Sequence, residues 1–435
     1  MEIKVRIQLP YEVEWVIGKI RDAGYEAFAV GGCVRDTLLG RTPEDWDVTT
    51  SARPEAVKAI FERTVDTGLQ HGTVTVLKNR KGYEVTTYRI DGEYHDGRHP
   101  DSVEFTPDLL EDLKRRDFTI NAMAYSHETG IVDEFGGMED LKAGIVRCVG
   151  RPEDRFTEDA LRLLRALRFS AQLGFEIEES TYAAIKTIAP NLAKVSKERV
   201  QAELTKLLLS AHPERILLLK ETGLSAQIVP GFDAVFASVN EADRGGTAAP
   251  VPASALAPAP DSAPPLFFRL SRLPAEKSLR WAGFLLCQRE KQAEAVLKGL
   301  KMDNETIGNV SRMIEGAKET LLLEKPAVRR AMSRYTPYQL EGALKLKELM
   351  GSPDAEEIRR LREEIIRDGD CVSLKDLAVK GRDLLEAGVE RGPMVGEILN
   401  HLFDLVLLHP EKNDRELLLK EVRRFSQDRE AAAKL

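Results

Sequence analysis

The hydrophobic pattern of the chain changes once, close to residue 150, and this change limits the folds that are open to it. Upstream, apolar and polar residues alternate in short runs, as in HGTVTVL, where Val74 and Val76 share one face of a predicted strand. Downstream, apolar residues recur with a helical period, as Leu161, Leu164 and Leu167 do. We therefore expect an α+β fold, with a small sheet and its helices first and helices from there to the end.

The first part of the chain carries the signals of an α/β unit. A helix is predicted over 13–22, ended by Gly24, and an apolar strand over 25–30. A short helix ending at Gly40 and a strand over 45–49 follow, and YEVTTYRI alternates in the same way as HGTVTVL.

Composition bounds the class of protein. A chain of 435 residues exceeds what one hydrophobic core usually organises, so two to four packing units are expected. No leader pattern opens the sequence and no apolar run approaches the roughly 18 residues of a membrane span, which predicts a cytoplasmic protein without membrane contact. The net charge of −8 leaves nucleic-acid binding open, because such binding depends on local patches. The four cysteines lack the paired spacing of a zinc site, so we expect all of them to be packing residues.

Two carboxylates in EDWDVTT are the first candidate for chemistry. Asp45 and Asp47 stand two residues apart on a predicted strand, so both side chains leave the same face. Such like charges would repel each other unless a Mg²⁺ ion or ion pair bound them. An isolated Asp-x-Asp is more often a solvated strand end, so its context has to decide.

The context is VGGCVRDTLLG, in which a strand runs into Gly31 and Gly32 and a helix begins. Glycines let the backbone approach a phosphate, and the free N–H groups of the new helix favour an anion. Arg35, one turn later, could add a bidentate contact. An ordinary Gly-Gly turn is as good an explanation of this segment taken alone. Together with Asp45 and Asp47, however, it forms a specific order of phosphate turn and metal pair.

This order of motifs resembles the polymerase-β-like nucleotidyltransferase superfamily, and within it the bacterial tRNA nucleotidyltransferase and poly(A) polymerase branch. DGEYHDGRHPDSVEF looks like the flexible loop of the family, at 91–105. LKRRDFTINAMA looks like its arginine-bearing motif, with Arg116, and RFTEDALRLLRALRF like its nucleotide-selecting motif. The resemblance also suggests Glu84 as a third catalytic carboxylate; otherwise Glu84 is a sheet-surface residue.

The selecting motif places a carboxylate and a row of cations on one predicted helix. Asp159 and Arg162 are three residues apart, and Arg165 and Arg168 continue the row, so all four could face one cleft. A carboxylate accepts from an exocyclic amino group and a guanidinium donates to ring acceptors, so Asp159 and Arg162 could pair with cytosine or adenine and reject uracil and guanine. Arg165, Arg168 and Arg116 would neutralise triphosphate charge. A salt-bridged amphipathic helix is the alternative interpretation.

By resemblance, the chain adds CCA to the 3′ end of tRNA, without a template, from CTP and ATP. The tRNA 3′-hydroxyl would attack the α-phosphate, Mg²⁺ held by Asp45 and Asp47 would assist, and pyrophosphate would leave. The nucleotide-binding residues would be Gly32, Arg35, Arg116, Asp159, Arg162, Arg165 and Arg168. No obligate protein partner is expected of an enzyme that adds the full CCA.

The resemblance also suggests four segments. A nucleotidyltransferase head with a small mixed sheet would span 1–148, and a helical neck with the selecting motif 149–235. An Ala/Pro-rich linker or insertion would follow at 236–265, and a helical body and tail that bind tRNA at 266–435.

Several related activities remain open at this stage. The loop at 91–105 is present at length, which disfavours an enzyme that adds only CC, whereas addition of only the terminal A is harder to exclude. The chain lacks the long basic C-terminal extension of bacterial poly(A) polymerases, and LRWAGFLLCQ has no histidine for a phosphohydrolase site. An inactive RNA-binding relative would need a broken metal pair, and Asp45 and Asp47 are both present.

Overall fold

A computed structural model describes residues 6–92, 103–238 and 266–432. The chain divides into two compact units, one formed by residues up to 271 with 295–302, the other by 272–294 with 303–435. The predicted boundary between head and neck at 148/149 lies inside the first unit and stays a prediction. Most of the loop expected at 91–105 and of the Ala/Pro-rich segment at 236–265 lies outside the described residues.

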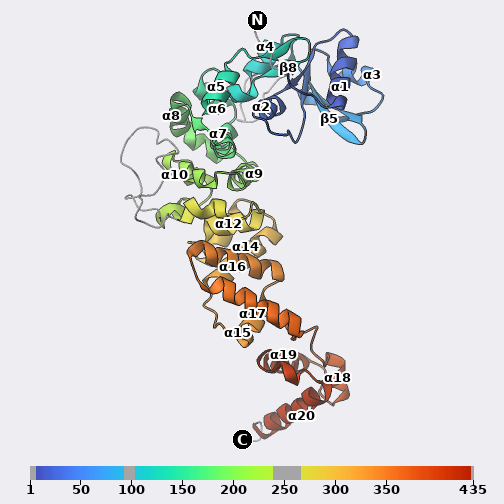
Figure 1. Cartoon of the computed structure of the whole chain (residues 1–435), viewed down its shortest axis with the longest axis vertical. Helices are drawn as coiled ribbons and strands as arrows, with labels where there is room; N and C mark the ends of the chain where they lie inside the picture. The colour runs from blue at the N-terminus through green and yellow to red at the C-terminus, as the bar shows by residue number, and fades with distance from the viewer. Residues whose placement is uncertain (1–5, 93–102, 239–265, 433–435) are drawn as a thin grey trace. The chain divides into compact units, whose positions relative to one another are not determined.

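A mixed sheet of seven strands forms the head of the first unit (Figure 1). Its order is β3-β4-β5-β2-β1-β8-β9, and all neighbours are antiparallel except β2 and β5, which are parallel. The strands are β1 Ala27–Val30, β2 Val48–Thr50, β3 Thr64–Gly68, β4 Thr73–Lys78, β5 Lys81–Thr87, β8 Ala124–Ser126 and β9 Gly130–Val132. The predicted alternation is confirmed, because Val74 and Val76 are fully buried.

Short helices cover this sheet and connect its strands. They are α1 Tyr11–Asp22, α2 Gly32–Leu38, α3 Pro54–Ile60, α4 Leu109–Lys114 and α5 Gly137–Ala143. The helices α1 and α3 pack side by side against the sheet (Figure 1). A separate ribbon of β6 Arg89–Asp91 and β7 Val103–Phe105 pairs antiparallel, and so joins the two ends of the loop predicted at 91–105.

The rest of the first unit is mainly helical, as the change of period predicts. It contains α6 Pro152–Glu158, α7 Leu161–Leu173, α8 Glu179–Ile188, α9 Lys197–Leu208, α10 Leu218–Glu221 and α11 Ser225–Ile228. Leu161, Leu164 and Leu167 are buried on α7. The expectation of helices alone was wrong at one place, since β11 Glu176–Ile177 pairs in parallel with β10 Ile145–Val146.

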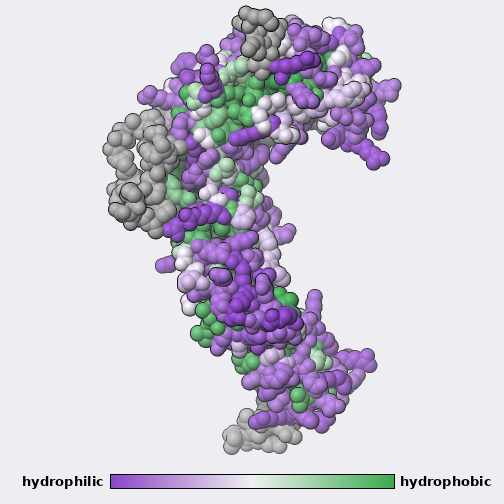
Figure 2. Space-filling model, in the orientation of Figure 1, coloured by the Kyte–Doolittle hydropathy of each residue, from purple (hydrophilic) through white to green (hydrophobic). Residues whose placement is uncertain are grey.

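The second unit is a series of helices in the part of the chain that the structure describes. They are α12 Lys277–Leu285, α13 Glu290–Gly299, α14 Asn304–Lys318, α15 Lys325–Arg334, α16 Pro337–Met350, α17 Asp354–Asp368, α18 Gly381–Glu386, α19 Pro393–Leu408 and α20 Arg415–Ala432. Of these, α13 is divided between the two units. On α17 the buried residues Ile358, Leu361 and Ile365 share one side, and Figure 2 shows hydrophilic residues over the exposed side.

None of the described helices is long and apolar enough to cross a membrane. Of the four cysteines, Cys33, Cys148 and Cys371 are buried as expected. Cys287 is exposed, so the prediction that it packs in the core was wrong. The reason is its position directly after α12, where the chain turns outward before α13.

A buried arginine connects the last helices of the second unit to the helices before them. Arg329 on α15 forms an ion pair of 2.9 Å with Asp370 and donates to the backbone carbonyl of Leu407, at the end of α19. Its side chain is only 5% exposed, so both partners are needed to offset its desolvation.

Replacing Arg329 should therefore destabilise the second unit. Arg329→Leu leaves the Asp370 carboxylate without its buried partner, which should cost about 3 kcal/mol of unfolding free energy. Arg330→Leu, at the exposed neighbouring position, should change it by less than about 0.5 kcal/mol. Urea denaturation followed by circular dichroism measures both variants. Equal midpoints for the two would show that the Arg329 pair contributes no stability.

Candidate active site

The turn after β1 depends on a glycine with an unusual backbone. Gly31 caps α2 with a φ of 80°, in the region that favours glycine. A Cβ atom at this position would lie 2.9 Å from a guanidinium nitrogen of Arg116. The turn therefore needs glycine for its backbone, whereas the Arg116 side chain could shift to make room for a Cβ atom. Gly32, the residue predicted to bind nucleotide, is the first residue of α2 and has an ordinary φ.

The acidic pair lies beside this turn but not on a strand as predicted. The strand expected over 45–49 begins only at Val48, so Asp45 and Asp47 precede it. The reason is that β2 pairs with β1 from Val48 onward, and Asp47 contributes only its carbonyl, which accepts from the Val30 N–H at 3.0 Å. The prediction of a strand carrying both carboxylates was therefore wrong, although Asp47 stands at the start of β2.

The parallel register of β2 and β5 brings a third carboxylate into the same region. Val48 lies opposite Val85, so the preceding residues, Asp47 and Glu84, stand at the same end of the two strands. Partial desolvation of the Asp47 carboxyl, which remains exposed to solvent, raises its pKa, and the negative charges of Glu84 and Asp45 raise it further. The positive charge of Arg116 acts in the opposite direction.

This group of carboxylates fits a divalent cation chemically. Its donors are all oxygens, and the repulsion from Glu84 and Asp45, which adds to desolvation in raising the pKa of Asp47, is one that a cation would relieve. Within residues 6–92, 103–238 and 266–432, no three acidic, histidine or cysteine side chains are close enough to enclose a metal ion by themselves. Two carboxylates would therefore share the ion with phosphate oxygens and water, as in nucleotidyl transfer. The role of Glu84 as a third ligand stays a prediction.

A buried aspartate on α4 binds Arg116, whose charge acts on Asp47, and its neighbour Arg115. Asp112 is fully buried and accepts hydrogen bonds from Arg115 at 2.8 Å and from Arg116 at 3.4 Å. It also accepts from the Thr49 hydroxyl of β2 at 3.1 Å. Although burial favours the neutral acid, the charges of Arg115 and Arg116 hold the pKa of Asp112 below its usual range. No motif in the sequence marks Asp112 as part of the site.

A second buried network joins α2, α7 and the loop after α4. Arg35 donates to both carboxylate oxygens of Asp36 at 2.9 Å and to the amide oxygen of Asn121 at 2.6 Å. Asn121 in turn donates to Asp117, which accepts from Arg165 at 2.7 Å. All three guanidinium nitrogens of Arg35 therefore donate to protein side chains. The adjacent Asp36 thus binds Arg35 through both carboxylate oxygens, and the phosphate contact expected of Arg35 stays a prediction.

The predicted selecting residues lie together around a small cavity of about 260 Å³ in the first unit. The cavity is lined by Arg115, Arg116, Asp117, Asp159, Leu161, Arg162, Arg165 and Arg199. Asp159 does not stand on a helix as expected. It lies between α6 and α7 with extended backbone, and its carboxylate accepts from the Leu161 N–H at 3.0 Å. Asp159 is thus placed by capping the first turn of α7.

Asp159 has a partner that sequence reasoning missed. Arg199 on α9 donates to both carboxylate oxygens, at 3.2 and 2.7 Å. Arg162 donates to the Glu158 carboxylate and to the carbonyl of Arg155 at 3.1 Å. The two selecting side chains are therefore oriented by neighbours on both sides. Arg199 is 40 residues away from Asp159, so only the packing of α7 on α9 could reveal the pair.

Arg168, the last residue of the predicted row, points away from the cavity that Asp159 and Arg162 line. Arg168 is 7% exposed, binds the Glu203 carboxylate and donates to Gln172 at 2.7 Å. It does not line the cavity, so the expectation that all four charges face one cleft was wrong. The reason is the helix itself, since Arg162 and Arg168 are six residues apart on α7, about 1.7 turns at about 3.6 residues per turn, so their side chains leave different sides of the helix. Arg168 instead stacks on Phe169, with its guanidinium carbon 3.9 Å from the ring centre.

Comparison with known proteins agrees with this geometry. Models of three families match: the poly A polymerase head domain over residues 27–147, the "Probable RNA and SrmB-binding site of polymerase A" over 174–236, and tRNA nucleotidyltransferase domain 2 over 274–422. The CCA-adding enzyme of Leuconostoc mesenteroides is 37% identical over 97% of this chain and 98% of its own length. That of Enterococcus faecalis is 36% identical over 93% of each chain.

The chain belongs to the CCA-adding enzyme family. Among solved structures, it is similar to the Bacillus stearothermophilus CCA-adding enzyme in complex with CTP, with a TM-score of 0.80 and 33% identity. That likeness covers 98% of this chain and all of the other. The family membership confirms the predicted class of nucleotidyltransferase and its α+β head followed by helices. It also implies dependence on a divalent metal ion.

The pKa values of Asp47 and Asp112 are shifted in opposite directions, so replacing each by asparagine should change the melting temperature in opposite directions. The folded-state pKa of Asp47 is raised, so its ionisation opposes folding above that pKa. In metal-free buffer at neutral pH, Asp47→Asn should therefore melt at or above the wild-type temperature. The pKa of Asp112 is lowered, so its charge stabilises the fold above the unfolded pKa, and Asp112→Asn should melt several degrees lower.

Differential scanning fluorimetry in EDTA checks this contrast, and nucleotide incorporation with Mg²⁺ checks the function. Asp47→Asn should lose about a thousand-fold in rate, because a metal contributes several kcal/mol to the transition state. If Asp47→Asn melts well below the wild type, the ionised carboxylate stabilises the metal-free fold. If Asp47→Asn keeps the wild-type rate with Mg²⁺, its catalytic assignment fails.

Proposed function

We propose that this chain completes the 3′ end of tRNA by adding C, C and A from CTP and ATP, with release of pyrophosphate. One observation carries the proposal: Asp159 and Arg162 line the same small cavity as Arg116 and Asp117. We infer that Asp159 and Arg162 form a base-pairing edge beside Arg116, whose charge acts on Asp47. The relatives named as CCA-adding enzymes, matched over nearly their whole length, support the same reaction.

The base would be selected by hydrogen bonds to protein. Cytosine and adenine each present an amino group beside a ring acceptor, which suits a carboxylate beside a guanidinium. Oδ1 of Asp159 accepts from both Arg199 and the Leu161 N–H, but among the described residues Oδ2 accepts only from Arg199, so its second lone pair can still accept from an amino group. Uracil and guanine would place a carbonyl oxygen against that carboxylate. Arg116 and Arg165 lie where they can neutralise triphosphate charge.

The carboxylates would supply the metal site for transfer. We assign the ion as Mg²⁺, held by Asp45 and Asp47, with Glu84 facing them. When bound, it makes the tRNA 3′-hydroxyl a better nucleophile and stabilises the leaving pyrophosphate. The protein's part is to hold hydroxyl and α-phosphate in line, which the rigid network around Asp112 and Asp117 favours. No obligate protein partner is needed for this reaction, and a cytoplasmic location remains a prediction from the sequence.

Three tRNA transcripts test the proposed function: one ending before CCA, one after C and one after CC. With Mg²⁺, CTP and ATP, all three should grow to a single CCA end and stop there. Extension of only the CC-ended transcript by one A would make the protein an A-adding enzyme. Long A tracts would make it a poly(A) polymerase, and no incorporation would reject the proposal.

Asp159→Asn tests the selecting edge. An asparagine can still cap α7 with its oxygen, but its amide nitrogen can donate to the carbonyl oxygen of uracil. The ratio of kcat/KM for CTP over UTP should fall by about ten-fold or more, in line with roughly 1–3 kcal/mol for a base contact. Asp45→Ala, the control, should abolish incorporation of both nucleotides. An unchanged CTP preference in Asp159→Asn would remove Asp159 from the selecting role.

A further inference from the structure

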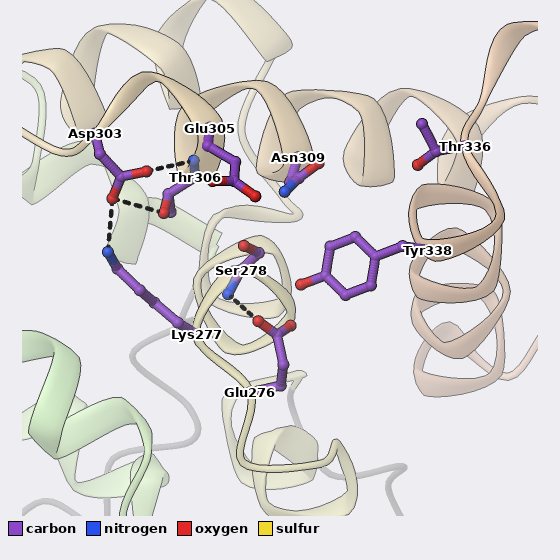
Figure 3. Close-up of a pocket in the computed structure, with 9 residues that line it drawn as sticks. All are labelled: Glu276, Lys277, Ser278, Asp303, Glu305, Thr306, Asn309, Thr336 and Tyr338. Atoms are coloured by element: carbon purple, nitrogen blue, oxygen red, sulfur yellow. Dashed lines mark hydrogen bonds and ion pairs between the residues drawn. The ribbon is translucent and has the colours of Figure 1, made fainter.

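Two cavities in the second unit carry opposite charge. The larger, of about 750 Å³, lies where α12, α14 and α16 begin, and Figure 3 shows Tyr338 pointing toward its acidic side chains. Glu276 caps α12 there, and Asp303 caps α14 while binding Lys277 at 2.7 Å. With Glu305 also on its wall, this cavity would repel a phosphate.

The other cavity, of about 540 Å³, has the reverse character. It is lined by Arg289, Glu290, Lys291, Gln292 and Lys318, so three cations face one carboxylate. All three cations are exposed to solvent. An anion in this cavity would meet a net positive charge, although the whole chain carries a net charge of −8.

The fold builds this cluster from two separate parts of the chain. Lys318 is the last residue of α14, and its ammonium group donates to the backbone carbonyl of Gln288. This bond fixes the end of α14 against the turn between α12 and α13. The turn itself is held by the Arg289 N–H, which donates to the side chain of Gln292 at 3.3 Å. The cations are therefore brought together by tertiary structure.

Two of these cations have no partner of their own. Some other exposed arginines of this unit are paired, such as Arg312 with Glu315 at 2.8 Å and Arg360 with Glu357. In the ranges that the structure describes, neither Arg289 nor Lys291 makes a side-chain hydrogen bond or ion pair. Three cations that share one cavity with a single carboxylate are electrostatically unfavourable, and an anion with several oxygens would relieve the repulsion between them.

We propose that Arg289, Lys291 and Lys318 bind a phosphate of the tRNA backbone. This rests on the proposed function, which supplies the tRNA. The guanidinium of Arg289 can bind two phosphate oxygens at once, while the lysines add point charges. Such a contact depends on the phosphate charge and not on the base sequence, so it strengthens the binding of all tRNAs alike. It leaves the choice between CTP and ATP unaffected.

The test removes both unpartnered charges at once in Arg289→Gln/Lys291→Gln. The matched control, Arg312→Gln/Arg360→Gln, loses the same net charge from the same unit, but from arginines that already have carboxylate partners. Fluorescence anisotropy gives the Kd for tRNA as a function of salt, and initial rates give KM and kcat. A third variant, Arg289→Lys/Lys291→Arg, keeps both charges.

The Gln double variant should bind tRNA about ten-fold more weakly near physiological salt, with a salt slope shallower by about two. Its KM for ATP and its kcat at saturating tRNA should match the wild type. The control and the charge-keeping variant should bind tRNA as the wild type does.

Two results would overturn the proposal. The first is a tRNA affinity and salt slope equal to those of the control. The second is a raised KM for ATP with unchanged tRNA binding, which would make the cavity a triphosphate site. Because anisotropy measures binding without turnover, a wild type that binds tRNA through this cavity but incorporates nothing would reject the proposed function and keep the phosphate site.

Discussion

The carboxylate of Asp112 connects the parts of the site that have opposite charge. It is buried on α4, yet it accepts from Thr49 on β2 and from both arginines that follow α4. The strand that Asp47 precedes is thereby tied to the guanidinium that faces Asp47. A buried charge persists only with such partners, so Arg115 and Arg116 are ordered before any nucleotide arrives. Electrostatic catalysis depends on charges that are already in place.

The same arrangement explains how a protein cavity can replace a template strand. Hydrogen bonds distinguish bases only when donor and acceptor are held at fixed positions. Asp159 is held by the first turn of α7 and by Arg199, and Arg162 by Glu158. Rigidity at this edge comes from ion pairs between helices distant in sequence. The pair that we propose selects the base is thus held in place partly by the packing of α7 on α9.

Sequence reasoning succeeded where one local rule decides the outcome. Alternation placed Val74 and Val76 in the core, and the helical period placed the leucines of α7 there. It failed where position depends on distant partners: Asp45 and Asp47 were assigned to a strand whose start is set by pairing with β1, and Arg168 to a cleft although Glu203 binds it. Asp112 and Arg199 carry no local signature, because one is an ordinary helical acid and the other an ordinary helical base. Their roles exist only after folding.

The parallel pairing of β2 with β5 has a consequence for how the enzyme comes into being. Parallel neighbours cannot be joined by a tight turn, so the chain must first complete α3, β3 and β4 before Glu84 can reach Asp47. Contacts of such wide sequence separation form late in folding. The cavity further requires Arg199, so a nascent chain on the ribosome cannot assemble the site until about half of it has been synthesised. The nucleotide cavity of this tRNA-processing enzyme therefore forms only after the ribosome, itself using mature tRNAs, has made about half of the chain.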